Sequence, residues 1–198
     1  MEHSKITGDQ SFWEDRWASK ATGWDIGSVS TPFKVFIDQL EDKDTAILIP
    51  GCGNAYEAEY LLEMGFKHIT LIDISPTATA ILAAKFKAKP QVKVLCEDFF
   101  QHTGQYNLIL EQTFFCALLP ELREAYVTRM HDLLLPDGRL AGLLFDRHFE
   151  QDGPPYGGSK AEYEAIFSPC FELLSFERCQ HSIPQRKDTE LWMEARRR

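Results

Sequence analysis

The feature that most constrains the fold of this 198-residue chain is a series of short, continuous apolar runs between residues 45 and 145. The runs are shorter than typical buried helices, and amphipathic or polar segments separate them. We expect strands at residues 45–51, 68–73, 91–98, 106–112 and 138–145. Because continuous apolar strands are buried on two sides, the pattern predicts a mostly parallel sheet that is covered by helices on both faces.

The segments between these strands have apolar residues at helical spacing and recognisable ends. Thr31 as N-cap and Pro32 suit the start of a helix, Gly65 suits the end of one, and Pro136 is expected to stop a long one. The expected helices span residues 31–40, 54–65, 75–86, 119–135 and 159–167. After the Pro- and Gly-rich loop 146–158, residues 171–183 and 190–196 alternate like two strands, which predicts a terminal antiparallel hairpin.

Length and composition indicate one domain over residues 1–198. The formal net charge is −9 and the pI about 5.2, so neither nucleic acid nor an anionic membrane is an expected partner. No apolar window reaches the length of a membrane span, and no signal-like run follows the start, so we expect a cytoplasmic protein. The five cysteines are scattered, which predicts neither a disulfide framework nor a metal site.

The residues that end each strand are the candidate site, because ligands of open α/β sheets bind at the carboxyl ends of the strands. The first strand ends in "PGCGN", where Gly51 and Gly53 allow a tight turn and close approach of a ligand to the backbone. Asp73 ends the second strand about twenty residues later, where a carboxylate accepts hydrogen bonds from ribose hydroxyls. The alternative is a chance turn in which Asp73 only precedes the capping residue Ser75, but the spacing favours a nucleoside site.

The residues after the glycine turn indicate which nucleoside cofactor fits. Tyr56 stands where a dinucleotide site has its third glycine, and Glu57 and Glu59 would repel a pyrophosphate. The same two carboxylates suit a ligand that carries an ammonium group. A cofactor with a ribose and a cationic amino acid but no phosphate is therefore expected, and S-adenosyl-L-methionine is such a molecule.

The third and fourth strands end in further candidates. Asp98 is placed to accept a hydrogen bond from an adenine amino group and Phe99 to lie against the ring, although a solvated acid and a core phenylalanine explain these residues equally well. Glu111 and Gln112 end the fourth strand, so we expect them at the lip where the transferred group lies.

Three of the four tryptophans precede the first strand, in "WEDRWASKATGW". Trp13 and Trp17 are four residues apart and share one face of the expected helix, and Trp24 follows the turn at Gly23. One interpretation is a leading helix docked on the core. The other is that residues 1–42 form a lid over the cofactor site, because indole faces attract the cofactor's sulfonium cation and exclude water.

With these positions assembled, the chain resembles a class I S-adenosylmethionine-dependent methyltransferase of the thiopurine S-methyltransferase family, in its thiol and halide methyltransferase-like branch. The resemblance covers almost the whole chain and rests on "FWEDRWASKATGWDIG", "IPGCG", "LIDIS", "EDFF", "FFCALLPELREAY", "LLPDGRL", "DGPPY" and "SIPQRK". It implies a three-layer αβα Rossmann-like methyltransferase sandwich with a mostly parallel seven-stranded sheet. Asn54, Ala55 and Glu57 depart from the family's glycine turn, and Gln112 replaces an aromatic residue of some relatives.

Strand-end position and resemblance together give the expected cofactor-binding residues: Trp13, Trp17, Trp24, Gly51, Cys52, Gly53, Asp73, Ile74, Asp98, Phe99, Glu111 and Gln112. Arg123 matches an arginine near the family's substrate site and is expected to stabilise an anionic acceptor. Asp146 or His148 is expected to take a proton, against the alternative that His148 is a solvent-facing loop residue.

The expected reaction is methyl transfer to a small-molecule acceptor, with S-adenosyl-L-homocysteine as product. A thiol, thiopurine-like sulfur, bisulfide or halide is favoured as acceptor. Transfer to oxygen, nitrogen or arsenic of another metabolite is an alternative, and so is a non-catalytic S-adenosylmethionine-binding protein, which the intact set of Gly51, Asp73 and Asp98 disfavours. We expect a monomer or a weak homodimer.

Overall fold

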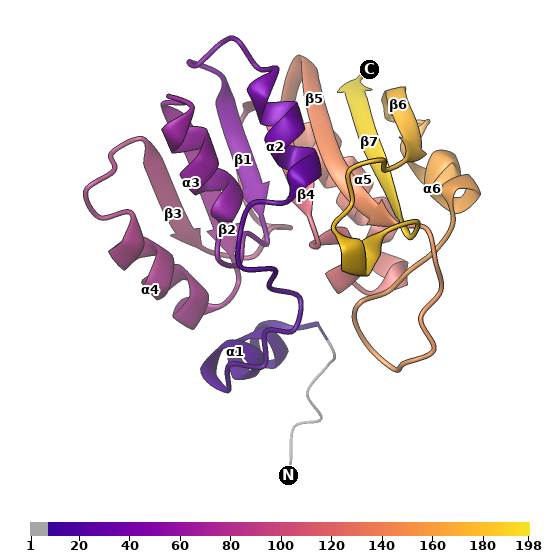
Figure 1. Ribbon diagram of the computed structural model, residues 1–198, viewed down its shortest axis with the longest axis horizontal. Helices are drawn as coiled ribbons and strands as arrows, with labels where there is room; N and C mark the ends of the chain where they lie inside the picture. Colours follow the sequence, from indigo (N-terminus) through magenta and orange to yellow (C-terminus); the bar gives the residue numbers. More distant parts are fainter. Residues whose placement is uncertain (1–7) are drawn as a thin grey trace.

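The computed structural model describes residues 8–198, and its strands form one sheet in the order β3-β2-β1-β4-β5-β7-β6 (Figure 1). The strands are β1 Ala46–Pro50, β2 His68–Asp73, β3 Val92–Cys96, β4 Tyr106–Gln112, β5 Leu134–Phe145, β6 Phe171–Arg178 and β7 Glu190–Arg197. Strands β1 to β5 run parallel, whereas β7 is antiparallel to both of its neighbours, β5 and β6. The predicted parallel sheet with a terminal antiparallel hairpin is confirmed.

In the described residues, five helices, α2 to α6, cover the two faces of this sheet, and a sixth, α1, lies outside these layers. The helices are α1 Gln10–Ala18, α2 Thr31–Asp38, α3 Tyr56–Glu63, α4 Pro76–Lys85, α5 Arg123–Leu133 and α6 Lys160–Phe167, with 3-10 turns at Phe115–Ala117, Pro120–Leu122 and Pro184–Arg186. Figure 1 shows α1 apart from both layers, across the end of the sheet to which β1–β4 point. The predicted domain 1–198 and the predicted lid 1–42 both include residues 1–7, which lie outside the described residues.

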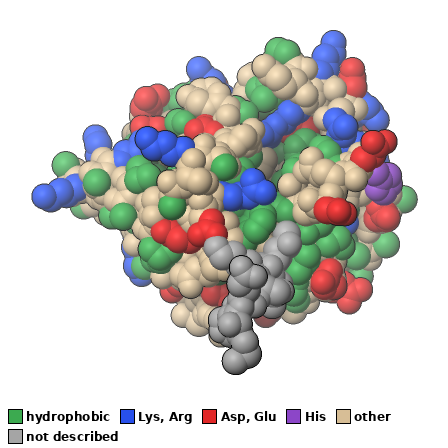
Figure 2. Space-filling view, turned by 90° about the horizontal axis from the view of Figure 1, so that it is seen from below, with side chains coloured by type: hydrophobic (Ala, Val, Ile, Leu, Met, Phe, Trp, Pro, Cys, Tyr) green, Lys and Arg blue, Asp and Glu red, His purple; other side chains and the backbone are tan. Residues whose placement is uncertain are grey.

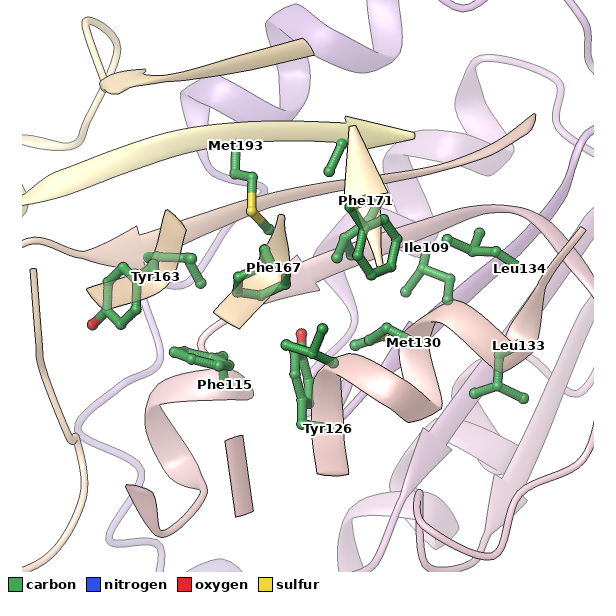
Figure 3. Packing of buried hydrophobic residues seen from close by; sticks show 14 of the residues in the cluster. Ile109, Phe115, Tyr126, Met130, Leu133, Leu134, Tyr163, Phe167, Phe171 and Met193 are labelled. Carbon is green, nitrogen blue, oxygen red and sulfur yellow. The ribbon is translucent and has the colours of Figure 1, made fainter. Parts of the chain in front are cut away.

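The buried side chains form two clusters, one on each face of the sheet. Alternate residues of one strand enter different clusters: Leu48 of β1 belongs to the cluster with α5 and α6, and its neighbours Ile47 and Ile49 belong to the cluster with α2, α3 and α4. Figure 3 shows the first of these clusters, in which Tyr126 and Phe167 from the two helices face the strands. This two-sided burial explains why the strands are continuous apolar runs.

The strand order changes direction between β1 and β4. From β1 the chain builds outward through β2 to β3, and it then returns to place β4 on the other side of β1. Loops that leave β1 and β4 at this point diverge to opposite faces of the sheet, so a crevice opens outside their carboxyl ends. The fold therefore fixes where a ligand site forms.

Several boundaries differ from the prediction; the strand predicted at 171–183 ends at Arg178, and the helix predicted from residue 54 begins at Tyr56. Pro136 does not stop a helix, because α5 already ends at Leu133 and Leu134 has extended backbone that pairs with Tyr106 of β4. Pro136 instead lies within β5, beside the irregular register between β4 and β5, where its missing N–H is tolerated. At the start of the segment predicted as a helix over 119–135, residues 120–122 form a 3-10 turn. In α2, the N-cap residue is Ser30 rather than Thr31.

Among residues 8–198, no helix combines the length and the apolar character that crossing a bilayer requires.

Candidate active site

A cavity of about 860 Å³ lies at the carboxyl ends of the parallel strands. Its walls include residues that follow each of these strands: Gly51 after β1, Ile74 after β2, Asp98 after β3, Thr113 after β4, and Phe145 at the end of β5. Figure 2 views the molecule from this end and shows acidic and basic side chains interspersed with hydrophobic ones. The cavity is therefore at the change of strand order, where the fold predicts a ligand.

The turn after β1 is held in a conformation that only small residues adopt easily. Gly51 has φ +55°, and a Cβ atom placed there would lie 2.4 Å from Cδ2 of Phe114, so a side chain at this position is excluded. Gly53 also has a positive φ, and its N–H donates to Oδ2 of Asp73 at 3.1 Å. The turn after β1 is thus fixed both to the loop after β4 and to the end of β2.

Asp73 retains acceptor capacity toward the cavity. It is 8% exposed, and its second oxygen, Oδ1, accepts from the N–H of Ser75 at 2.9 Å. Burial raises the pKa of Asp73 above its ordinary value, while the backbone donors oppose that rise. A carboxylate has about four lone-pair sites, and the backbone N–H groups of Ser75, Gly53 and Ile74 use only part of them, so acceptor capacity remains for a hydroxyl.

The loop after β3 contributes a polar and an aromatic group to the cavity. Asp98 lines the cavity while its Oδ1 accepts from the N–H of Phe100 at 2.9 Å. Phe99 also lines the cavity, and it is at the same time part of the buried cluster, with its ring centroid 5.1 Å from that of Phe114. Phe99 is thus a core residue that also borders the cavity, and its contact with an adenine ring stays a prediction.

Three indoles form part of the cavity wall. Trp13, Trp17 and Trp24 all line it, and their rings meet edge to face, with centroids 5.5 Å apart for Trp13 and Trp24 and 6.2 Å apart for Trp17 and Trp24. A Cβ atom placed at Gly53 would lie 3.7 Å from Cζ2 of Trp17 and 3.9 Å from Nε1 of Trp24. Two of the indoles therefore lie directly against the glycine turn.

The segment that carries these indoles is fastened to the rest of the site. The carboxylate of Glu14 on α1 accepts from the hydroxyls of Ser75 and Thr77 and from the N–H of Thr77 at the start of α4. These hydrogen bonds lower the pKa of Glu14. Asn54, one of the departures from the family's glycine turn, donates to Oδ2 of Asp25 at 2.6 Å. The lid segment is thus linked to both the glycine turn and α4.

One predicted cofactor residue lies elsewhere. Glu111 is not at the lip, because its side chain is fully buried beneath the loop after β4. Its Oε1 accepts from the N–H groups of Phe114 and Phe115, each at 2.9 Å, and its Oε2 accepts from the hydroxyl of Tyr126 at 2.6 Å. Glu111 therefore holds the loop in place, while Gln112 lines the cavity and accepts from the Ser30 hydroxyl at 3.4 Å.

The three residues expected to act on the acceptor do not line the cavity. Arg123 donates to the carbonyl of Gly157 at 2.8 Å, and its guanidinium carbon lies 4.9 Å from the ring centroid of Phe115, so it ties two loops together. Asp146 accepts from Arg178 and from the first N–H of α6, and His148 is exposed. Their roles toward the acceptor stay predictions. The prediction for Arg123 rests on the resemblance alone, and for Asp146 and His148 a position after a strand does not determine where the side chain points.

Two arginines that the sequence analysis did not consider line the cavity instead. Arg16 is on α1, three residues after Trp13 on the same side of the helix, a spacing that gave a usable signal. Arg186 lies in "SIPQRK" and donates to the carbonyl of Trp24 at 3.1 Å and to Glu190 at 3.4 Å. Its distance from Trp24 in sequence explains why no local pattern reveals it.

Glu57 is a second buried acid of the cavity, beside Asp73. It is 5% exposed on the first turn of α3, and burial raises its pKa to about 6, although Arg186 and Lys85 oppose the rise.

Within residues 8–198, no three His, Cys, Asp or Glu side chains are grouped so that they could hold a metal ion.

Comparisons with known proteins agree with this geometry. The sequence profile of the thiopurine S-methyltransferase family matches residues 8–196. The chain is 34% identical to probable thiol methyltransferase 2 of Arabidopsis thaliana over 90% of its own length and 81% of the relative's. It is 30% identical to thiocyanate methyltransferase 1 of the same plant, over 93% of its own length and 83% of the relative's.

The chain belongs to the thiopurine S-methyltransferase family. Its activity is S-adenosylmethionine-dependent methyl transfer, as the sequence predicted. The fold is also that of 1,6-didemethyltoxoflavin-N1-methyltransferase of Burkholderia thailandensis, crystallised with bound 1,6-didemethyltoxoflavin and S-adenosylhomocysteine. The TM-score is 0.74 at 20% identity, over 95% of this chain and 86% of the other.

The buried carboxyl of Glu111 predicts a pH dependence of stability. Burial raises its pKa from an ordinary 4.5 to about 7, so between these values the folded protein holds a proton that the unfolded chain has released. The free energy of unfolding should therefore fall as pH rises from about 5 to 8, by roughly 1–3 kcal/mol from this group.

Urea denaturation of Glu111→Gln at pH 5 and pH 8 measures this contribution. The pH difference should shrink relative to the unmodified protein, with Glu57 and Asp73 supplying what remains, and Glu124→Gln, an exposed position on α5, should leave it unchanged. An unchanged pH difference in Glu111→Gln would show that the Glu111 carboxyl does not titrate in this range.

Proposed function

We propose that this enzyme transfers the methyl group of S-adenosylmethionine to a small sulfur acceptor or a comparable anion, which binds beside Arg186. The observation that carries the proposal is one cavity whose wall combines acids and indoles around the glycine turn with an arginine, Arg186. The names of two relatives, a probable thiol methyltransferase and a thiocyanate methyltransferase, support an acceptor of this class.

The residues of the cavity fit the cofactor. Asp73 has free acceptor capacity for ribose hydroxyls, Asp98 for the adenine amino group, and Glu57 for the ammonium of the methionyl group. When it is bound, the cofactor supplies an activated methyl group on a sulfonium sulfur. Trp13, Trp17 and Trp24 would lie against that cation, since aromatic faces attract positive charge.

The protein's task in this reaction is to orient the acceptor and exclude water. Methyl transfer is an in-line displacement with a good leaving group, and positioning of the two reactants is worth roughly 7 to 11 kcal/mol. The indole wall and the loop residues Phe114 and Leu118 enclose the cavity with apolar groups. We infer that residues up to 42 act as a lid within a single domain.

Arg186 is the group that prepares the acceptor. A free thiol has a pKa of about 8.5, so little thiolate exists at neutral pH, and a guanidinium nearby favours the ionised form. Glu190, only 3% exposed, and the Trp24 carbonyl hold the Arg186 side chain in the wall. Asp146 and His148 are outside the cavity lining, so we assign the deprotonation of a thiol to solvent rather than to either residue.

The remaining expectations on partners stay proposals. We infer a small-molecule acceptor and a monomer or weak homodimer in the cytoplasm, with no nucleic-acid or membrane partner. The net charge of −9 and the interspersed charges around the cavity end support this view.

Asp73→Ala tests the cofactor site. We expect calorimetry to show at least a tenfold loss of S-adenosylhomocysteine affinity, because a charged hydrogen-bond acceptor is removed from a buried site. Asp73→Asn, which keeps an oxygen for Ser75, checks that the loss is not unfolding, and Asp132→Ala at an exposed position should bind normally. Unchanged affinity in both Asp73 variants would contradict the ribose assignment.

Arg186→Gln tests the acceptor site. With labelled S-adenosylmethionine, the rate with thiols should fall tenfold or more and its pH profile should move to higher pH, whereas Arg186→Lys should retain part of the rate. For thiocyanate, which is an anion at every pH tested, KM should rise without a pH shift. The exposed control Arg178→Gln should behave like the unmodified enzyme.

A panel of thiols, bisulfide, thiocyanate, iodide and thiopurines, with phenols and amines beside them, identifies the acceptor class. Methylation confined to the phenols or amines would overturn the proposed acceptor, and so would a rate with thiols that Arg186→Gln leaves unchanged.

A further inference from the structure

The first turn of α3 is unfavourable for a carboxylate. The N-terminus of a helix usually attracts anions, but Glu57 and Glu59 both lie in the first turn of α3. The methionyl group of the cofactor carries a carboxylate as well as an ammonium. Since Glu57 suits the ammonium, the carboxylate needs a cation from another part of the cavity wall.

Within the described part of the chain, the cavity wall contains two cationic side chains, Arg16 and Arg186. Arg186 is already engaged by Glu190 and by the carbonyl of Trp24, and its guanidinium carbon lies 5.6 Å from the ring centroid of Phe145 at the end of β5. These contacts already use donors on both terminal nitrogens of the Arg186 guanidinium. Arg16 is the remaining candidate for the carboxylate.

The environment of Arg16 suits an anionic ligand. Its guanidinium carbon lies 4.7 Å from the ring centroid of Phe12, and its Nε atom is buried without a hydrogen-bond partner among residues 8–198. A buried donor of a charged group is costly when it is unpaired, so a ligand that accepts from it gains binding energy. Its neighbours on α1, Trp13 and Trp17, already line the same cavity.

We propose that Arg16 binds the carboxylate of the cofactor's methionyl group. This inference rests on the proposed cofactor site and assigns one of its contacts to the lid helix rather than to the sheet. Arg16 and Glu57 then recognise the two opposite charges of the amino acid from two separate elements, α1 and α3. Cofactor binding and docking of α1 are coupled as a result, because each provides part of the other's binding energy.

Decarboxylated S-adenosylmethionine is the matched probe, because it keeps the ribose, the sulfonium and the amine and lacks only the carboxylate. Calorimetry on the full chain should show that the unmodified enzyme prefers S-adenosylmethionine over this probe by about 10- to 100-fold, the size of one charged hydrogen-bonded contact. Arg16→Gln should bring the two affinities close together by weakening only S-adenosylmethionine. Arg16→Lys should keep part of the preference.

Lys20→Gln is the control, since it removes one positive charge from the same segment at an exposed residue outside the cavity lining. It should leave both affinities unchanged. The preference is a ratio within one variant, so partial unfolding affects both ligands equally and does not alter it. An Arg16→Gln variant that retains the full preference, or that weakens both ligands alike, would overturn the assignment of Arg16. If the unmodified enzyme binds neither ligand, the proposed cofactor site itself is wrong.

Discussion

The backbone turn at the end of β1 is the constraint on which the rest of the site depends. Gly51 and Gly53 both have positive φ, and the N–H of Gly53 is held by the carboxylate of Asp73 from the neighbouring strand. Phe114 lies so close to Gly51 that a β-carbon there would clash. Because the turn touches the loops after β2 and β4, its shape sets the positions of the groups proposed to bind the ribose and the reacting part of the cofactor.

The lid extends this arrangement to the other side of the cavity. Trp17 and Trp24 lie against Gly53, and Glu14 joins α1 to the start of α4, which directly follows the loop after Asp73. Acids after the strands and on the leading segment, together with Arg16 and Arg186, give the cavity wall charges of both signs. This distribution suits a cofactor with both charges and an acceptor that reacts as an anion.

The sequence predicted the fold well because burial on two sides leaves a direct mark, the continuous apolar run. The predicted strand ends then located Gly51, Asp73 and Asp98 as candidate site residues, because the topology alone brings the carboxyl ends of parallel strands together. The direction in which a side chain at a strand end points has no comparable signal in the sequence. Glu111 and Gln112 are adjacent at the end of β4, yet one points into the core and the other into the cavity, as alternation along a strand requires. The place of Arg186 in the cavity wall depends on a contact with Trp24, which is remote in sequence, so no local sequence pattern indicates that Arg186 lines the cavity.

The central claim is that the indoles of the leading segment form the wall against the cofactor's cation. A crystal structure of the enzyme with sinefungin, an analogue in which a carbon atom bearing an ammonium group replaces the methylsulfonium, tests it most directly. We expect at least one ring among Trp13, Trp17 and Trp24 to lie within about 6 Å of the ammonium nitrogen. A complex in which the analogue occupies the cavity while all three rings lie farther away and face solvent would contradict the claim.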